Sequence, residues 1–141
     1  MIVLVQATVL TVGLNGRNEA LRELPVRLIT MQSGIAAARS LKSEKVNSVI
    51  SRWDLEDMPD GRFLKSLRAA KPYVPTIALI RAGSKAQEIA ARSLGVTAVL
   101  AEDATDAVLR DTVANLLGIE GGVAIRAISS AGNVEELMRE S

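Results

Sequence analysis

Four carboxylates near the middle of the chain are the side chains best suited to hold a cation or to transfer a proton. Asp54, Glu56, Asp57 and Asp60 follow the apolar run 46–51, at the expected carboxyl end of a strand. Carboxylate oxygens are the ligands that hard divalent cations prefer. The same residues also suit a solvated loop in which Asp60 caps the following helix, and this second interpretation is favoured.

The chain has no histidine and no cysteine among its 141 residues. Their absence excludes histidine acid–base catalysis, a phosphohistidine relay, thiolate catalysis, disulfides and thiolate metal sites. No convincing base, nucleophile or electrophile accompanies the carboxylates, so we expect no enzymatic activity and no cofactor. The lack of cysteine also fits a reducing, cytoplasmic location.

The charges of the chain are balanced, with 17 basic and 16 acidic residues interspersed along it. No basic stripe is available to displace counterions from a nucleic acid, so we expect no binding to DNA or RNA. The apolar segment 1–14 lacks a basic region, includes polar residues and is too short to span a bilayer. We therefore interpret it as a strand and expect no membrane association.

Five short apolar runs recur along the chain, and each has the length of a strand. Their apolar character is nearly continuous rather than alternating, which is typical of parallel strands covered on both faces. The runs are 8–14, 26–31, 46–51, 76–80 and 97–101.

Segments with helical spacing follow the second to fifth runs. Their apolar stripes are Ile35, Ala38 and Leu41; Phe63, Leu64, Leu67 and Ala70; Ile89, Ala90 and Leu94; and Ala107, Val108, Val113, Leu116 and Leu117. This alternation predicts an α/β fold with a doubly wound, five-stranded parallel sheet of flavodoxin-like type. Only about ten residues join the first two runs, so the first helix should be short or irregular.

Residues with capping preferences mark the helix ends. Ser84 with Gln87 forms a capping-box pattern, and Gly95 and Gly118 lie where helices should end. The pattern predicts one domain over residues 1–118 and a C-terminal extension or tail over 119–141. In that extension, residues 123–129 could add a strand, and Asn133 with Glu136 could cap a last helical turn.

The stretch 46–117 resembles the second half of a bacterial response-regulator receiver domain. The first part of this stretch resembles the family's third strand, Asp-Gly loop, third helix and fourth strand, and reads VNSVISRWDLEDMPDGRFLKSLRAAKPYVPTIALI. The second part resembles the family's fourth helix, Gly-Ala-type turn, fifth strand and fifth helix, and reads AQEIAARSLGVTAVLAEDATDAVLRDTVANLL. The first half of the chain resembles the family more loosely. The resemblance implies a receiver-like domain and a role in two-component signal transduction.

Receivers transfer a phosphoryl group to an aspartate, with Mg²⁺ held by that aspartate and by two acidic residues after the first strand. A Thr or Ser after the fourth strand and a Lys after the fifth contact the phosphoryl group. The corresponding positions here are Gly13 and Leu14 for the acidic pair, Trp53 or Arg52 for the acceptor, Ile80 for Thr or Ser, and Glu102 for Lys. The resemblance therefore implies a degenerate, pseudo-receiver pocket without the family's phosphorylation chemistry.

Three neighbours of this pocket have alternative interpretations. Asp54 could approach the pocket if the loop register slipped, although no acidic partner or lysine would accompany it. Trp53 could anchor a partner or plug the vestigial pocket beside Leu14 and Ile80, and plugging is favoured. The loop 15–18 lacks a glycine pattern for phosphate binding and is interpreted as a turn.

A second candidate region is the face that mediates dimerisation and output contacts in receivers. Its charged residues are Arg81, Lys85, Arg92, Asp103, Arg110 and Asp111. Mixed charges suit a specific interface, and ordinary solvation explains the same residues equally well.

These features support the hypothesis of a stand-alone pseudo-receiver that binds a protein partner or a second copy of itself, as a homodimer, independently of phosphate. Only about two dozen residues remain after the last predicted helix, so we expect no output domain. The alternative is a flavodoxin-like domain that binds a small ligand or nucleotide at the carboxyl ends of the strands.

Overall fold

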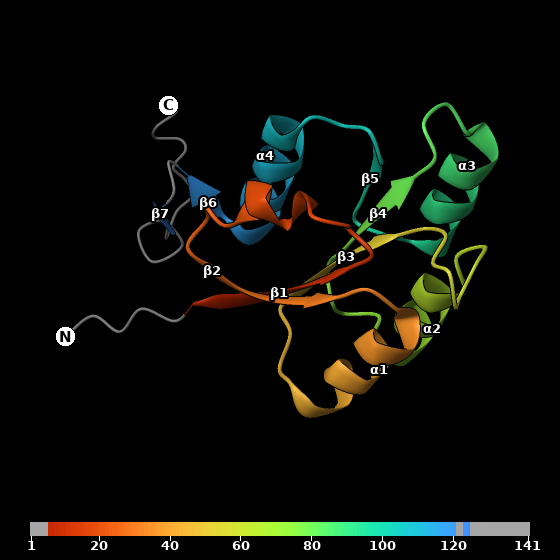
Figure 1. The fold of residues 1–141 in the computed structure, drawn as a ribbon, viewed down its shortest axis with the longest axis horizontal. Helices are drawn as coiled ribbons and strands as arrows, with labels where there is room; N and C mark the ends of the chain where they lie inside the picture. The colour runs from red at the N-terminus through yellow and green to blue at the C-terminus, as the bar shows by residue number, and fades with distance from the viewer. Residues whose placement is uncertain (1–5, 121–122, 125–141) are drawn as a thin grey trace.

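The computed structural model describes residues 6–120 and 123–124. A five-stranded parallel sheet with the strand order β2-β1-β3-β4-β5 forms its centre (Figure 1). The strands are β1 (Ala7–Val12), β2 (Val26–Met31), β3 (Ser48–Arg52), β4 (Thr76–Ile80) and β5 (Ala98–Ala101). The predicted α/β fold with a five-stranded parallel sheet is confirmed.

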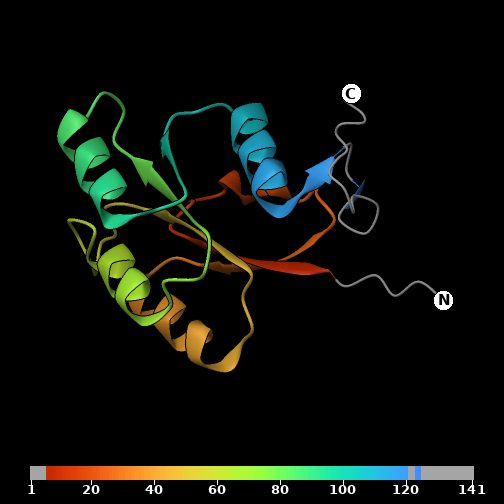
Figure 2. The same cartoon turned by 180° about the vertical axis from the view of Figure 1, so that it is seen from behind.

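Helices cover both faces of the sheet, as Figures 1 and 2 show. The helices α1 (Gly34–Ser43), α2 (Arg62–Ala70) and α3 (Lys85–Leu94) lie on one face, and η1 (Arg17–Leu21) and α4 (Asp106–Leu117) lie on the other. Within β1, Leu10 and Val12 belong to the first core, and Val9 belongs to the second. This double coverage explains why the strands are apolar at nearly every position.

The first crossover is the short 3₁₀ helix η1, which confirms the expectation of a short or irregular first helix. Ala20 and Leu21 of this helix are buried and pack against the sheet. Asn18 is also buried, and its side-chain oxygen accepts a hydrogen bond of 2.6 Å from the Thr11 hydroxyl. The polar group is therefore satisfied inside the core.

The direction of the apolar stripes is less simple than the spacing predicts. Three stripe residues are exposed: Ile35 at 52%, Ile89 at 62% and Val108 at 44%. Ala91 in α3 and Leu109 in α4 occupy the core side of their helices instead. A stripe read from spacing alone includes residues at its edge, and only packing decides which of them are covered.

Most predicted helix ends are confirmed. The Ser84 hydroxyl accepts the Gln87 N–H at 3.2 Å at the start of α3. Gly95 and Gly118 end α3 and α4 in the left-handed region, with φ of 89° and 70°. This conformation is open to glycine and costly for residues with a Cβ.

The expected cap at Asp60 is wrong. Helix α2 begins after Gly61, and no side chain forms a capping hydrogen bond there. Asp60 has a φ of 60°, and its own N–H donates to the Asp54 carboxylate at 2.6 Å. Asp60 therefore lies in a turn with a left-handed backbone conformation, which aspartate tolerates better than most residues.

Beyond α4, the chain forms a small antiparallel pair of strands, β6 (Ile119–Glu120) and β7 (Val123–Ala124). Of the strand predicted over 123–129, only β7 lies within the described residues. The predicted turn at 133–136 and residues 1–5 lie outside them. None of the helices in the described part of the chain has both the length and the apolar character that a membrane span requires.

Candidate functional site

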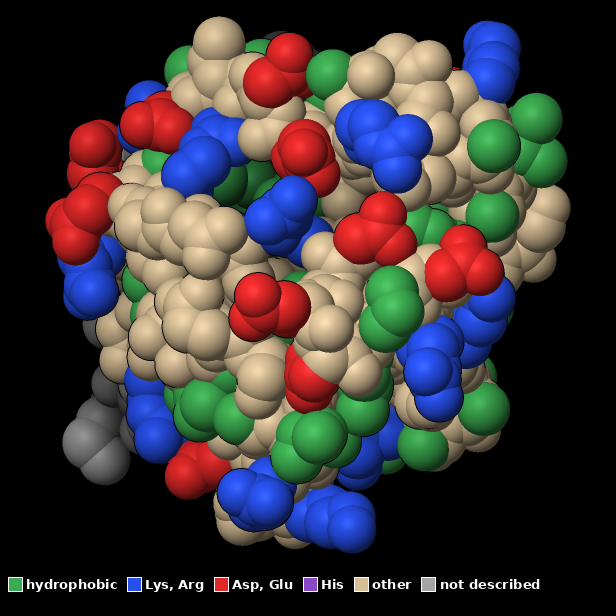
Figure 3. Space-filling model, turned by 45° about the vertical axis from the view of Figure 1, so that its right-hand side comes forward, with side chains coloured by type: hydrophobic (Ala, Val, Ile, Leu, Met, Phe, Trp, Pro, Cys, Tyr) green, Lys and Arg blue, Asp and Glu red, His purple; other side chains and the backbone are tan. Residues whose placement is uncertain are grey.

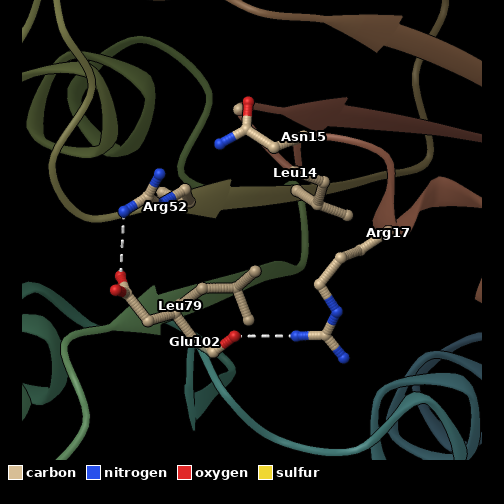
Figure 4. Close-up of a pocket in the computed structure, with 7 residues that line it drawn as sticks. Leu14, Asn15, Arg17, Arg52, Leu79 and Glu102 are labelled. Atoms are coloured by element: carbon tan, nitrogen blue, oxygen red, sulfur yellow. Dashed lines mark hydrogen bonds and ion pairs between the residues drawn. The ribbon is translucent and has the colours of Figure 1, made fainter.

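The carboxyl ends of β1, β3, β4 and β5 surround a cavity of about 220 Å³ (Figure 4). Its lining is Gly13, Leu14, Asn15, Arg17, Arg52, Leu79 and Glu102. Four of the residues predicted for the degenerate pocket, Gly13, Leu14, Arg52 and Glu102, are therefore brought together from three separate parts of the chain. The cavity lies at the sheet edge where open α/β folds bind ligands.

Arg52 and Glu102 form an ion pair across this cavity. The Arg52 Nη2 atom lies 3.2 Å from Glu102 Oε2, and the two side chains are 33% and 35% exposed. Arg52 is the last residue of β3, and Trp53 does not line the cavity. Of the two residues considered at the tip of β3, Arg52 therefore has its side chain at the pocket.

Arg17 is a further pocket residue, although the segment 15–18 by itself predicts only a turn. Its guanidinium donates to the backbone carbonyl of Glu102 at 2.7 Å, to the carbonyl of Ala104, and to Asp106 Oδ1 at 3.0 Å. Glu102 is thus held by Arg52 through its carboxylate and by Arg17 through its carbonyl (Figure 4). No local motif marks Arg17, because the residues it contacts lie about 85 positions later.

The position of Gly13 shows why the pocket has no acidic side chain at this point. Gly13 has a φ of 75°, and a Cβ there would lie 2.7 Å from Leu55 Cδ2. A larger residue would be strained and would displace Leu55. With Leu14 as its neighbour, this loop offers no carboxylate to a cation.

The charges around the cavity are two guanidinium groups, from Arg17 and Arg52, and one carboxylate, from Glu102. Across the described ranges 6–120 and 123–124, no group of three or more acidic residues is arranged to hold a metal ion. The lining therefore suits a small anion better than a cation.

Trp53 is 2% exposed, which confirms the expected burial. Its indole lies against Gly61, where an added Cβ would be 2.3 Å from the ring, and Lys65 Nζ lies 5.9 Å from the ring centre. Trp53 belongs to the core beneath α1, α2 and α3, whereas Leu14 belongs to the core beneath α4. The interpretation of Trp53 as a plug beside Leu14 is therefore wrong, because the sheet separates the two side chains.

Ile80 is also absent from the cavity lining. It is buried in the same core as Trp53 and borders a different hollow, beside α3 and β5. The sequence count along β4 predicted Ile80 at the pocket, and Leu79 lines it instead. Successive strand residues face opposite sides of a sheet, so an offset of one position moves the side chain away from the site.

Asp54 connects two loops and does not line the cavity. Its carboxylate accepts hydrogen bonds from the Asp60 N–H at 2.6 Å and from Gln87 Nε2 at 2.9 Å, and Arg81 Nη2 lies 3.8 Å away. The Gln87 side chain therefore binds Asp54 and the Arg81 N–H rather than completing the capping box. These contacts tie the loop after β3 to the start of α3.

Asp57 caps a helix that lies earlier in the chain. Its carboxylate accepts the N–H groups of Gly34 and Ile35, both at 2.9 Å, at the start of α1. These hydrogen bonds lower the pKa of Asp57 below its ordinary value, because they stabilise the charged form. Asp54 and Asp57 are thus engaged in contacts within the fold, which differ from the helix cap at Asp60 that the sequence suggests.

The predicted interaction face is only partly assembled. Arg81, Lys85, Asp103 and Asp111 are exposed, and Arg92 pairs with Glu88 at 3.2 Å. Arg110 pairs with Glu23 at 3.6 Å, which places it on the side of α4 that faces the η1–β2 connection. Of the predicted residues, Lys85 lines a hollow of about 350 Å³, whose other lining residues are Ile80, Gly83, Ser84, Glu88, Val99 and Ala101.

Exposed apolar residues accompany these charges, with Ile89 on α3 and Val108 on α4. Figure 3 shows red, blue and green side chains mixed in its upper part, at the height of α3 in Figure 1. We call this surface of α3, β5 and α4 the α3–β5–α4 face. This face therefore combines exposed apolar side chains with charges of both signs.

No protein-family model matches the chain. Over 83 residues it is 31% identical to the chemotaxis protein CheY homolog of Campylobacter jejuni strain 81-176, an alignment that covers 57% of this chain and 64% of that protein. The homologues in two further strains of the same species match equally well. The matched region thus spans somewhat less than two thirds of these relatives.

Solved structures give a fuller comparison. A CheY-like receiver domain from Methanospirillum hungatei superposes with a TM-score of 0.72 at 14% identity, covering 79% of this chain and 94% of that one. CheY4 of Vibrio cholerae gives 0.70 at 19% identity, covering 80% and 100%. The receiver domain of the histidine kinase PA1611 from Pseudomonas aeruginosa, with magnesium in its active-site cleft, gives 0.67 at 22% identity, covering 79% and 97%.

These superpositions cover about four fifths of this chain and 94–100% of the matched chains. The chain therefore has the fold of response-regulator receiver domains.

Proposed function

We propose that the chain is a signal-transduction module of receiver type that works without phosphorylation and without enzymatic activity, by binding a protein partner or a second copy of itself. The observation that carries this proposal is the Arg52–Glu102 ion pair of 3.2 Å. By the resemblance to receivers, Arg52 occupies the place of the phosphoacceptor aspartate, and Glu102 occupies the place of the lysine.

The chemistry of phosphoryl transfer argues against phosphorylation at this pocket. An aspartyl phosphate requires a carboxylate acceptor, a cation held by carboxylates and positive charge near the transferred group. Arg52 cannot accept a phosphoryl group, Gly13 and Leu14 cannot hold Mg²⁺, and Glu102 carries a negative charge at the position where receivers have a lysine. The magnesium bound by the PA1611 receiver therefore has no equivalent set of ligands among these residues.

The same contacts hold the loop between β5 and α4 in one position without a bound phosphate. Glu102 is bound from β3 by Arg52 and from η1 by Arg17, which also binds Ala104 and Asp106. The β5–α4 loop is therefore held by charges that are always present. A signal would reach a partner through the amount or location of this domain rather than through its covalent state.

The α3–β5–α4 face is the proposed binding surface. Ile89 and Val108 are exposed in these elements, and so are the charged residues Lys85 and Asp103. Apolar groups near the centre of an interface supply most of the binding energy, and surrounding charges select the partner.

The test of phosphorylation independence is incubation of the chain with Mg²⁺ and acetyl phosphate, and separately with beryllofluoride. We expect an unchanged intact mass and unchanged amide NMR spectra. A phosphoaspartate at Asp54, detected by peptide mass spectrometry, would refute this part of the proposal.

A second candidate function is binding of a small anionic ligand or nucleotide. It is favoured by the cavity of about 220 Å³, which contains the guanidinium groups of Arg17 and Arg52. NMR titration with inorganic phosphate and with nucleoside phosphates tests it. Saturable shifts at Gly13, Leu14 and Arg52 would support ligand binding, and their absence at millimolar ligand would reject it.

A further inference from the structure

The fold collects basic residues on two neighbouring helices, although the chain as a whole is balanced in charge. Helices α1 and α2 contain no acidic residue, and their charged positions are Arg39, Lys42, Arg62, Lys65 and Arg68, with Lys71 at the end of α2. In the lower part of Figure 3, at the height of α1 and α2 in Figure 1, blue side chains gather around green ones. The two segments are basic in the sequence, and the fold places them side by side on one surface.

A groove of about 360 Å³ lies between these two helices. Leu41, Phe63 and Leu67 form its floor and are almost completely buried. Ala38, Met58 and Ala70 extend the apolar lining. The volume falls within the range of about 300–1,000 Å³ that is usual for binding pockets, and Met58 gives the lining an adaptable side chain.

The two lysines that line the groove lie at one of its ends. Lys42 is in the last turn of α1, and Lys71 is the C-terminal cap of α2. Both helices follow parallel strands and run in the same direction, so their ends lie at the same edge of the sheet. Among the residues that the structure describes, neither lysine forms an ion pair. Their charges are therefore available to an acidic ligand.

We propose that this α1–α2 groove docks an acidic amphipathic helix of a partner protein. Apolar residues spaced at i, i+3, i+4 and i+7 would enter the groove, and flanking Asp or Glu residues would meet Lys42 and Lys71. The inference rests on the proposed role in protein binding and names the chemistry of one partner. It uses a surface separate from the α3–β5–α4 face, so each surface can be tested alone.

Two synthetic peptides of identical Leu and Glu composition test the proposal on the full chain. One has Leu at the helical spacing above, and the other is scrambled so that it has no apolar face. We expect fluorescence anisotropy to detect binding of the first peptide only, and NMR to place the shifts on α1 and α2. Equal binding of the scrambled peptide would overturn the inference, because a general charge attraction would explain it.

Variants of the groove separate docking from charge attraction. Lys42→Glu combined with Lys71→Glu should weaken peptide binding about tenfold. Lys45→Glu combined with Lys85→Glu is the matched control, because both lysines are exposed and neither lines the groove, and it should change binding little. Circular dichroism of each variant verifies that it is folded.

Ser66→Arg distinguishes docking in the groove from general charge attraction. Ser66 is exposed and lines the groove, so arginine there would obstruct the groove while adding positive charge. Weaker peptide binding supports docking in the groove, and tighter binding overturns it. Binding to phosphatidylserine-containing vesicles that depends on Lys42 and Lys71, without peptide binding, would also overturn it in favour of a membrane surface. Lys85→Glu should leave peptide binding unchanged, because Lys85 lies outside the groove. If the α1–α2 groove does not bind the peptide, the proposed α3–β5–α4 face is unaffected, because it is a separate surface.

Discussion

The guanidinium of Arg17 donates a hydrogen bond of 2.7 Å to the backbone carbonyl of Glu102, 85 residues away in the chain. The contact joins the η1 helix on one side of the cavity to the end of β5 on the other. Because the acceptor is a backbone group, substitution of Glu102 does not remove it. Arg17 therefore has a role in stability that can be separated from the Arg52–Glu102 pair.

Substitution of Arg17 should destabilise the fold more than loss of an ordinary surface charge. We expect Arg17→Gln to lower the free energy of unfolding by about 2 kcal/mol, the scale of hydrogen bonds that involve a charged group. Urea unfolding measures the change. Arg22→Gln is the control, since Arg22 is exposed and forms an ion pair with Glu19 in the same turn, and it should cost far less. Equal losses for the two variants would contradict the proposed bridging role.

The Arg52–Glu102 pair predicts a charge-swap cycle. Each of Arg52→Glu and Glu102→Arg places like charges together, and the double variant restores opposite charges. We expect both single variants to be less stable than the double variant by about 1 kcal/mol, since the pair is partly exposed. Urea unfolding at low and high salt checks this, because salt should reduce the difference. Additive effects of the two changes would show that the side chains do not interact.

Asp57 predicts a pH dependence of stability. The pKa of its carboxyl is lowered in the folded state by the Gly34 and Ile35 N–H groups, so its stabilising effect is complete above the ordinary value of 3.8. The effect is lost as the pH falls below 3.8 through the lowered pKa of the folded state. Asp57→Asn should therefore be less stable than the parent chain at pH 7, and the gap should narrow in acid.

Thermal unfolding of both proteins between pH 7 and pH 3 measures this gap. Glu56→Gln removes a carboxylate from the same loop and controls for the change in charge. A gap that does not depend on pH would mean that Asp57 does not stabilise α1 through its charge.

Trp53 and Gly61 predict a stability effect away from the pocket. Trp53→Ala should cost on the order of 3 kcal/mol, because it empties a large site in the core. Gly61→Ala should also destabilise the fold, since its Cβ would meet the indole and its φ is 74°. Chemical unfolding followed by circular dichroism measures both effects. Red-shifted and readily quenched emission from the parent protein would contradict the burial of Trp53.

Self-association through the α3–β5–α4 face is open to a direct test. We expect Ile89→Glu to lower the average mass that light scattering measures at high protein concentration, because it places a charge on the exposed apolar part of this face. Ile35→Glu is the matched control, since Ile35 is similarly exposed but lies on α1. A parent chain that is monomeric at all concentrations would leave a different protein as the partner of this face.

The amino-acid sequence by itself determined the five strands, the double coverage of the sheet and the shortened first helix. Runs such as Thr76–Ile80 are apolar throughout because helices cover both faces, and this signal is local. The glycine ends of α3 and α4 were also predictable, since Gly95 and Gly118 adopt backbone conformations that other residues rarely do. The absence of acidic residues at Gly13 and Leu14 could likewise be read directly.

Only the tertiary structure decided which residues meet at the pocket and at the grooves. The contacts of Glu102 with Arg17 and Arg52 span 85 and 50 residues. They form because the parallel sheet brings the carboxyl ends of its strands to one edge. Whether Arg52 or Trp53 enters the cavity depends on one position of strand register, because neighbouring side chains face opposite sides of a sheet. The basic α1–α2 surface depends on both levels, since each helix carries only basic charges in its own sequence and the fold places the two helices side by side.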